Sequence, residues 1–199
     1  MARALILALC LGLFVSPAWA ALGRVEIGSP APGFSALGSD WRSHALSDYA
    51  GKIVVLEWTS PVCPYTALKY QRGLMQAIQG RATKAGVVWL SINTSPSGRP
   101  GHLTVEAAKA RLVATKAQAT SLVLDEDTRI GQAYGVRTTP TVFVIGKDGR
   151  LVYQGAVDPD PQKTRDDGQD YVTAALRDLR SAKPVKRPLT RAYGCAVEY

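Results

Sequence analysis

Cys63 is the residue in this chain whose type and surroundings point most directly to chemistry. It lies in the stretch EWTSPVCPYT (57–66), closely flanked by two prolines and with no second cysteine nearby. A cysteine can be a small buried residue, one half of a disulfide, or a nucleophile that reacts as the thiolate. The stretch by itself leaves these three interpretations open.

The elements around Cys63 favour the reactive interpretation. The preceding run KIVVLEW (52–58) is typical of a strand buried on both faces. Pro64 suits the first turn of a helix, and apolar residues then follow at roughly helical spacing, weakened by Gly73: Leu68, Leu74, Met75 and Ile78. A thiol at a helix N-terminus faces unpaired N–H groups and the positive end of the helix dipole, which lower its pKa. Cys63 is therefore a candidate nucleophile for disulfide exchange or peroxide reduction.

The N-terminus has the form of a secretory signal. Arg3 precedes the apolar run ALILALCLGLFV (4–15), and SPAWA then offers a cleavage site after Ala20. The run is too short to span a membrane as a mature helix, so we expect export to a bacterial periplasm without a membrane segment. Cleavage removes one of three cysteines and leaves Cys63 and Cys195 in an oxidising compartment, where they can pair.

The rest of the chain alternates predicted strands and helices. We expect strands over 52–58, 86–92 and 121–124, and a hairpin of 141–146 and 150–157 around Lys147-Asp148-Gly149. We expect helices after Cys63 and over 104–117, 126–135 and 170–182. This order predicts an α/β fold with a central mixed sheet flanked by helices. Chemistry in such folds usually lies where a central strand leads into a helix, which is where Cys63 lies.

Several motifs in this order resemble the thioredoxin-like superfamily, specifically its exported AhpC/TSA (redoxin) branch. They are GSPAPGF, LSDYAGKIVVLEW, Cys63-Pro64, YGVRTTPTVFVIGKDGRLVYQGAVD and the last helix. The resemblance implies a thioredoxin-like fold with an N-terminal extension. We expect a signal peptide at 1–20, a redoxin domain at 21–182 and a tail at 183–199, called the C-terminal tail below.

The resemblance also assigns roles to residues around Cys63. TTPTVFVI implies a cis bond between Thr139 and Pro140, placed beside the reactive cysteine and shaping the substrate site. Thioredoxins carry Cys-x-x-Cys, and Thr66 stands where the second cysteine would be. Thr66 could donate a hydrogen bond to the Cys63 thiolate, or could satisfy its own backbone.

Two further residues have a functional and an ordinary interpretation. Glu57 matches the buried acid of thioredoxins that moves protons, and a carboxylate in an apolar strand otherwise needs a salt bridge or exposure. Tyr65 could line the substrate groove or serve only in packing.

A comparison with peroxiredoxins gives weaker agreement. Their motif has a Pro, a Thr and an Arg where this chain has Leu56, Ser60 and Pro140, and Arg137 is the nearest arginine in sequence to the missing one. We therefore rank thiol peroxidase (antioxidant) activity below thiol–disulfide exchange.

Cys195, five residues from the end in TRAYGCAVEY, has three interpretations. It could be a resolving thiol that reaches Cys63 from a mobile tail or a second subunit. It could form a permanent disulfide, which stabilises by roughly 4 to 5 kcal/mol in the entropic description. Both thiols could also stay unpaired within the chain, with Cys195 linking to another protein.

Composition excludes several other functions. The net charge is +8, or +7 without Arg3, but no aromatic residues interleave with a basic stripe, so we expect no nucleic-acid partner. His44 and His102 lack ligand spacing, and we expect neither a metal nor a cofactor.

The sequence thus predicts an exported thiol–disulfide oxidoreductase with Cys63 as nucleophile. Its partners would be protein or small-molecule thiols and disulfides, and an upstream thiol reductant. The non-enzymatic alternative is a thioredoxin-like binding module whose cysteines are idle or locked together.

Overall fold

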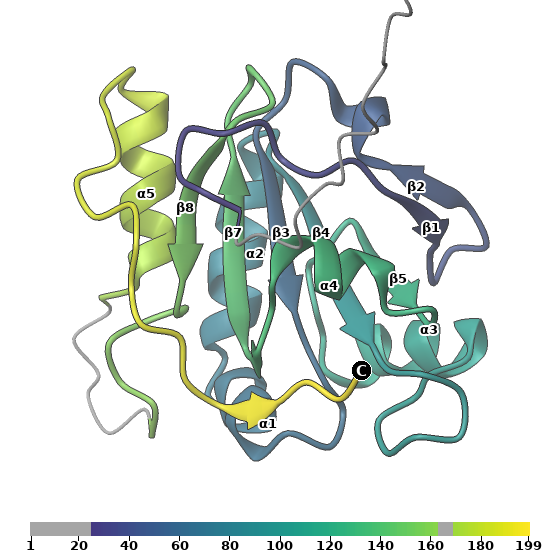
Figure 1. Ribbon diagram of the computed structural model, residues 1–199. Coiled ribbons are helices and arrows are strands. Elements are labelled where there is room, and N and C mark those ends of the chain that lie inside the picture. The colour runs from purple at the N-terminus through teal and green to yellow at the C-terminus, as the bar shows by residue number, and fades with distance from the viewer. Residues whose placement is uncertain (1–24, 163–168) are drawn as a thin grey trace, which may run out of the picture.

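The computed structural model describes residues 25–162 and 169–199, so the predicted signal peptide lies outside the described residues. Its centre is a five-stranded mixed sheet with strand order β5-β4-β3-β7-β8 (Figure 1). The strands of this sheet are β3 (Val54–Trp58), β4 (Val88–Thr94), β5 (Ser121–Asp125), β7 (Thr141–Ile145) and β8 (Leu151–Gly155). β3, β4 and β5 run parallel, whereas β7 and β8 are antiparallel to their neighbours, which confirms the expected mixed sheet.

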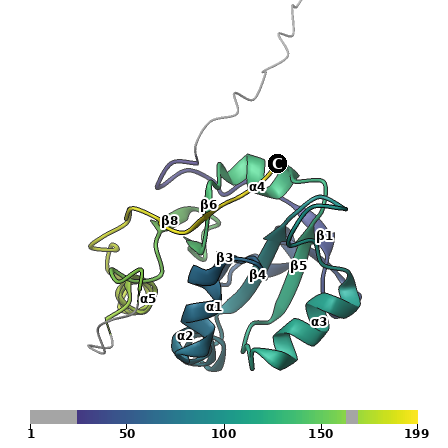
Figure 2. The same ribbon diagram turned by 90° about the horizontal axis from the view of Figure 1, so that it is seen from below.

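Helices cover both faces of the sheet. They are the 3-10 helix η1 (Leu46–Tyr49) and the α-helices α1 (Pro64–Gln71), α2 (Leu74–Lys84), α3 (Val105–Ala114), α4 (Arg129–Tyr134) and α5 (Tyr171–Arg180). α1, α2 and α5 share one apolar cluster with the sheet, and α3 packs on the same face through Ala108 and Leu122. α4 lies on the opposite face, as Figure 2 shows from below.

The central strand β3 is buried along its whole length, as its continuous apolar run predicts. Side chains alternate across a strand, so Val54, Leu56 and Trp58 enter the cluster on the α4 side. Val55 enters the cluster beneath α1 and α2, and Glu57 points to that same side. A carboxylate is thereby placed in the buried interior of the domain.

The helices expected at 126–135 and 170–182 are shorter at both ends, and two earlier boundaries differ for reasons that the backbone shows. The helical pattern after Cys63 is divided, because Gly73 adopts a left-handed conformation (φ 73°) and α2 starts afresh at Leu74. The next predicted helix ends at Ala114 instead of 117, where Lys116 has a positive φ of 53°. The hairpin expected at Lys147-Asp148-Gly149 is present between β7 and β8, with Gly149 at φ 75°.

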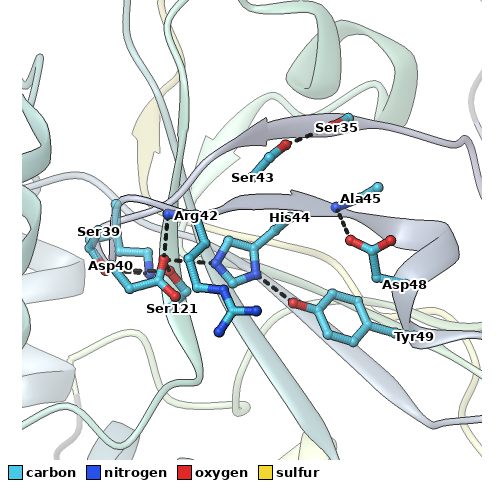
Figure 3. A network of polar contacts seen from close by, with 11 residues as sticks. Ser35, Ser39, Asp40, Arg42, Ser43, His44, Ala45, Asp48, Tyr49 and Ser121 are labelled. Atoms are coloured by element: carbon cyan, nitrogen blue, oxygen red, sulfur yellow. Dashed lines mark hydrogen bonds and ion pairs between the residues drawn. The ribbon is translucent and has the colours of Figure 1, made fainter.

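A polar network attaches the N-terminal hairpin of β1 (Ser35–Leu37) and β2 (Ser43–Ala45) to edge strand β5 (Figure 3). His44 Nε2 lies 2.9 Å from Asp40 Oδ1, and His44 Nδ1 contacts the Tyr49 hydroxyl. The hydroxyl of Ser121 donates to the same Asp40 oxygen at 3.3 Å. A β-carbon at Gly38 would lie 2.5 Å from Ser121 Oγ, so glycine allows this close approach.

The C-terminal tail follows β8 and then crosses the end of the sheet near α1 (Figure 1). Thr190 N donates to Gln154 O at 3.0 Å, and Val197 N donates to Arg137 O at 3.0 Å. Between these contacts, β9 (Cys195–Ala196) pairs antiparallel with β6 (Thr138–Thr139). The tail is therefore held by backbone pairing at several points.

Within residues 25–162 and 169–199, no helix has the length and apolar character needed to cross a membrane.

Candidate active site

Cys63 occupies the N-cap position of α1, at the end of the short loop that follows strand β3. Its φ and ψ of −85° and 117° are extended, and Pro64 opens the helix. The Ala67 N–H donates to the Cys63 carbonyl at 2.9 Å, so the first helical turn starts at the cysteine. The Cys63 side chain is 1% exposed. The structure thus has the strand, loop and helix order that the sequence predicts around Cys63.

Cys63 and Cys195 form a disulfide within one chain, with their Cα atoms 5.7 Å apart across 132 residues of sequence. This pairing removes the interpretation in which both thiols are unpaired. It agrees with both a redox pair and a permanent bridge.

The Thr139-Pro140 bond is cis, as the resemblance implies, and lies beside the disulfide. Cys63 Sγ lies 3.2 Å from the carbonyl oxygen of Thr139. Thr139 also pairs with Cys195 in the β6–β9 ladder. The cysteine of the tail is therefore presented to Cys63 by an extended backbone segment.

Gly194 allows the tail to approach this closely. It has a φ of 133°, and a β-carbon there would lie 1.9 Å from the carbonyl oxygen of Thr139. A side chain at this position would force β9 away from β6. The residue before Cys195 is consequently restricted to glycine.

Thr66 and Tyr65 lie near Cys63 on the first turn of α1. Thr66 is 1% exposed, and its Oγ1 has no hydrogen-bond partner among the described residues. A disulfide sulfur carries no negative charge, so the predicted bond from Thr66 to a thiolate has no acceptor in this state. The ring of Tyr65 is partly exposed and lies 6.1 Å from the ring of Tyr193 in the tail.

Glu57 is fully buried and accepts hydrogen bonds from four side chains. The donors are Tyr70 Oη at 3.0 Å, Gln79 Nε2 at 2.8 Å, Trp89 Nε1 at 2.8 Å and Ser91 Oγ at 3.1 Å. Burial raises the pKa of the Glu57 carboxyl above its ordinary value, and these four donors oppose the rise. No salt bridge involves Glu57 among the described residues, and the carboxyl is not exposed, so neither ordinary interpretation applies.

A buried ion pair next to the site was not found from the sequence. Lys69 Nζ lies 3.0 Å and 2.9 Å from the two carboxylate oxygens of Asp158, and both side chains are almost completely buried. Tyr193 donates its hydroxyl to Asp158 Oδ1 at 2.8 Å, and Lys69 Nζ lies 5.4 Å from the centre of the Tyr193 ring. The only local signal was the helical spacing of Thr66, Lys69 and Tyr70, which places all three on the inward face of α1.

Arg111 of α3 is a further residue that the sequence did not identify. Its Nη2 donates to the carbonyl of Ser60 at 3.4 Å, on the loop that leads to Cys63. Burial lowers the pKa of the Arg111 guanidinium. Arg137, the arginine considered from sequence, is exposed and contacts the tail through its backbone oxygen.

Two of the positions compared with peroxiredoxins have structural roles here. Leu56 is completely buried in the apolar cluster on the α4 side, and Pro140 belongs to the cis bond. The part of the chain that the structure describes holds no cluster of three or more potential metal ligands.

Comparisons with known proteins agree with this geometry. The AhpC/TSA family profile matches residues 27–154. The thiol-disulfide oxidoreductase ResA of Geobacillus thermodenitrificans is 33% identical over 129 residues, which cover 64% of this chain and 67% of that protein.

Solved structures show the same fold. A hypothetical protein from Sinorhizobium meliloti superposes with a TM-score of 0.78 at 21% identity, covering 89% of this chain and 96% of that one. The thioredoxin domain of a thiol-disulfide oxidoreductase from Bacteroides vulgatus gives a TM-score of 0.57 at 16% identity, covering 78% of this chain and 99% of that one. The fold is therefore thioredoxin-like, as the sequence motifs predicted, and the profile match over most of the domain shows that this chain belongs to the AhpC/TSA family.

Proposed function

We propose that this protein is an exported thiol–disulfide oxidoreductase in which Cys63 is the nucleophile and Cys195 the resolving thiol. Thiol–disulfide oxidoreduction itself is supported by the ResA relative and by membership of the AhpC/TSA family. The observation that carries the assignment of residues is the Cys63–Cys195 disulfide beside the cis Thr139-Pro140 bond.

The proposed reaction is a two-step exchange. In the reduced protein, the Cys63 thiolate attacks one sulfur of a substrate disulfide, forms a mixed disulfide and expels the other substrate sulfur as a thiolate. Cys195, as thiolate, then attacks Cys63 Sγ and expels the second substrate sulfur. Two electrons pass from the protein to the substrate, and the protein is left with the Cys63–Cys195 bond. The reverse sequence oxidises a substrate dithiol by the same atoms.

Thr66 and Glu57 have distinct roles in this proposal. The buried Thr66 hydroxyl lacks a partner in the disulfide state, and a Cys63 thiolate would supply an acceptor for it. Glu57 holds a proton more readily than an exposed carboxyl, so it can give up and take back protons as thiols ionise nearby. Pro140, Thr139 and Tyr65 form the wall against which a substrate segment lies.

The proposed substrates are protein or small-molecule thiols and disulfides, with an upstream thiol reductant that reopens the Cys63–Cys195 bond. The signal-like N-terminus supports export to a periplasm and cleavage near Ala20. We propose 21–182 as the catalytic domain and the C-terminal tail as its resolving segment.

The test compares wild-type protein with Cys63→Ser and Cys195→Ser. Reduced wild-type protein should reduce a protein disulfide such as that of insulin, Cys63→Ser should be inactive, and Cys195→Ser should accumulate the mixed disulfide. Absence of turnover and of any mixed disulfide would leave the binding-module alternative.

Peroxide consumption is followed in parallel with the same proteins. We expect slow consumption compared with disulfide exchange. Rapid peroxide turnover that is lost in Cys63→Ser would reverse the order of the two enzymatic functions.

A further inference from the structure

We infer that Lys69, Asp158 and Tyr65 form a specificity pocket for a tyrosine two residues before the reacting cysteine of a polypeptide substrate. This inference rests on the proposed function, because it takes the C-terminal tail as an internal occupant of the substrate groove. Within the tail, Tyr193-Gly194-Cys195 is the segment that contacts the site.

The backbone contacts define what the groove accepts. Cys195 pairs antiparallel with Thr139, and Ala196 pairs with Thr138. The tail thus adds strand β9 to the two-residue strand β6. Such backbone pairing favours an extended polypeptide over a small thiol as the substrate. The close approach of Gly194 to the Thr139 carbonyl selects glycine directly before the cysteine.

The side-chain contacts define the pocket for Tyr193. Its hydroxyl donates to Asp158 Oδ1 at 2.8 Å, its ring faces Lys69 Nζ at 5.4 Å, and it meets the Tyr65 ring at 6.1 Å. Asp158 is held by Lys69 and by the backbone N–H of Asp160 at 2.7 Å. Because these partners belong to α1 and the loop after β8, the acceptor stays in place when the tail leaves.

A phenol fits this pocket better than a phenyl ring. A phenylalanine would cover Asp158 without donating to it, which leaves a carboxylate oxygen without that bond in a water-poor site. A substrate cysteine preceded by Tyr-Gly therefore enters the groove as the tail does, and the returning tail displaces it when Cys195 attacks Cys63.

The test uses reduced Cys195→Ser, in which Cys63 is the single thiol of the mature chain. The probes are peptides with the tail sequence RAYGCAV (191–197), each with its cysteine joined to thionitrobenzoate. Attack of Cys63 on the peptide sulfur forms the mixed disulfide and releases coloured thionitrobenzoate. Two further peptides replace Tyr by Phe or Gly by Ala. The tail of the variant competes equally with all three peptides. The ratios of their reaction rates therefore measure how well the groove accepts each peptide.

We expect the Phe peptide to react about tenfold more slowly than the Tyr peptide, as for loss of a hydrogen bond to a charged group, and the Ala peptide to react slowest. Equal rates for the Tyr and Phe peptides would overturn the pocket while leaving the proposed function intact. If no peptide reacts, while thionitrobenzoate release from denatured protein shows that the thiol is present, both proposals fail.

A second measurement uses the full chain and does not depend on peptides. Tyr193→Phe should shift the equilibrium of the Cys63–Cys195 bond with glutathione about tenfold toward opening, because the oxidised state loses the bond to Asp158. Tyr171→Phe, which removes a phenol hydroxyl on α5, is the matched control and should leave that equilibrium unchanged. An unchanged equilibrium in Tyr193→Phe would contradict the pocket.

Discussion

Breaking the Cys63–Cys195 bond should greatly reduce the stability of the folded protein. The disulfide joins residues 132 apart in sequence, so it closes a long loop that includes every element from α1 to the C-terminal tail in the unfolded state. In the chain-entropy description, a loop of this length corresponds to about 5 kcal/mol in the free energy of unfolding. We therefore expect Cys195→Ser to lose up to this amount relative to the oxidised wild type.

Urea unfolding of oxidised wild type, reduced wild type and Cys195→Ser measures this loss. For a domain of this size, about 5 kcal/mol corresponds to a midpoint shift of roughly 2 M urea. Reduced wild type and Cys195→Ser should unfold together, because both lack the same bond. Cys63→Ser is the matched control for loss of the bond from its other end.

A common urea midpoint for all these proteins would refute the loop-closure argument. The same samples also separate a redox pair from a permanent bridge. Structural disulfides of secreted proteins resist reduction by glutathione, whereas catalytic disulfides are reduced by it. If Cys63 and Cys195 form a redox pair, a glutathione buffer should therefore open the wild-type bond. A bond that stays closed across the glutathione range would contradict the resolving role of Cys195.

Three further predictions concern buried polar groups. Burial raises the pKa of Glu57, so the native state binds this proton more tightly than the unfolded chain. Its stabilising contribution is present at low pH and is lost as pH rises through the folded pKa, so urea midpoints of wild type should fall with pH relative to Glu57→Gln. A parallel pH dependence in the two proteins would contradict this. Thr66→Val should raise the Cys63 thiol pKa in the reduced protein, measured by the pH profile of alkylation, and Thr66→Ser should restore it. Asp158→Asn should lower the free energy of unfolding by about 3 to 5 kcal/mol, because the Lys69 charge stays buried without its partner, and adding Lys69→Met should recover much of this loss. A double variant no more stable than Asp158→Asn would contradict the ion-pair argument.

Features of the site that depend on local sequence could be predicted. The apolar run before Cys63 and Pro64 after it predicted a cysteine at the start of a helix, and the family resemblance carried by the TTPT segment implied the cis-proline beside it. The strand and the helix start follow from backbone preferences over a few residues, which neighbouring residues largely set. Glu57 was also recognised from its local sequence, because a carboxylate inside a buried strand needs a compensating partner.

Interactions between distant segments could not be predicted from local patterns. Glu57 receives its hydrogen bonds from α1, α2 and β4, and Lys69 finds its partner Asp158 at a separation of 89 residues. Lys69 has no local feature that distinguishes it from a surface lysine, because its burial depends on where the loop after β8 lies.

The sequence by itself determined the strand and helix order, the position of Cys63 between a buried strand and a helix, and the absence of a second cysteine at position 66. The tertiary structure alone decided that Cys195 pairs with Cys63, since the C-terminal tail must pair with β6 and bring Gly194 against Thr139. The physical reason is that such contacts depend on packing across the whole domain, whereas helix starts and buried strands depend on residues close in sequence.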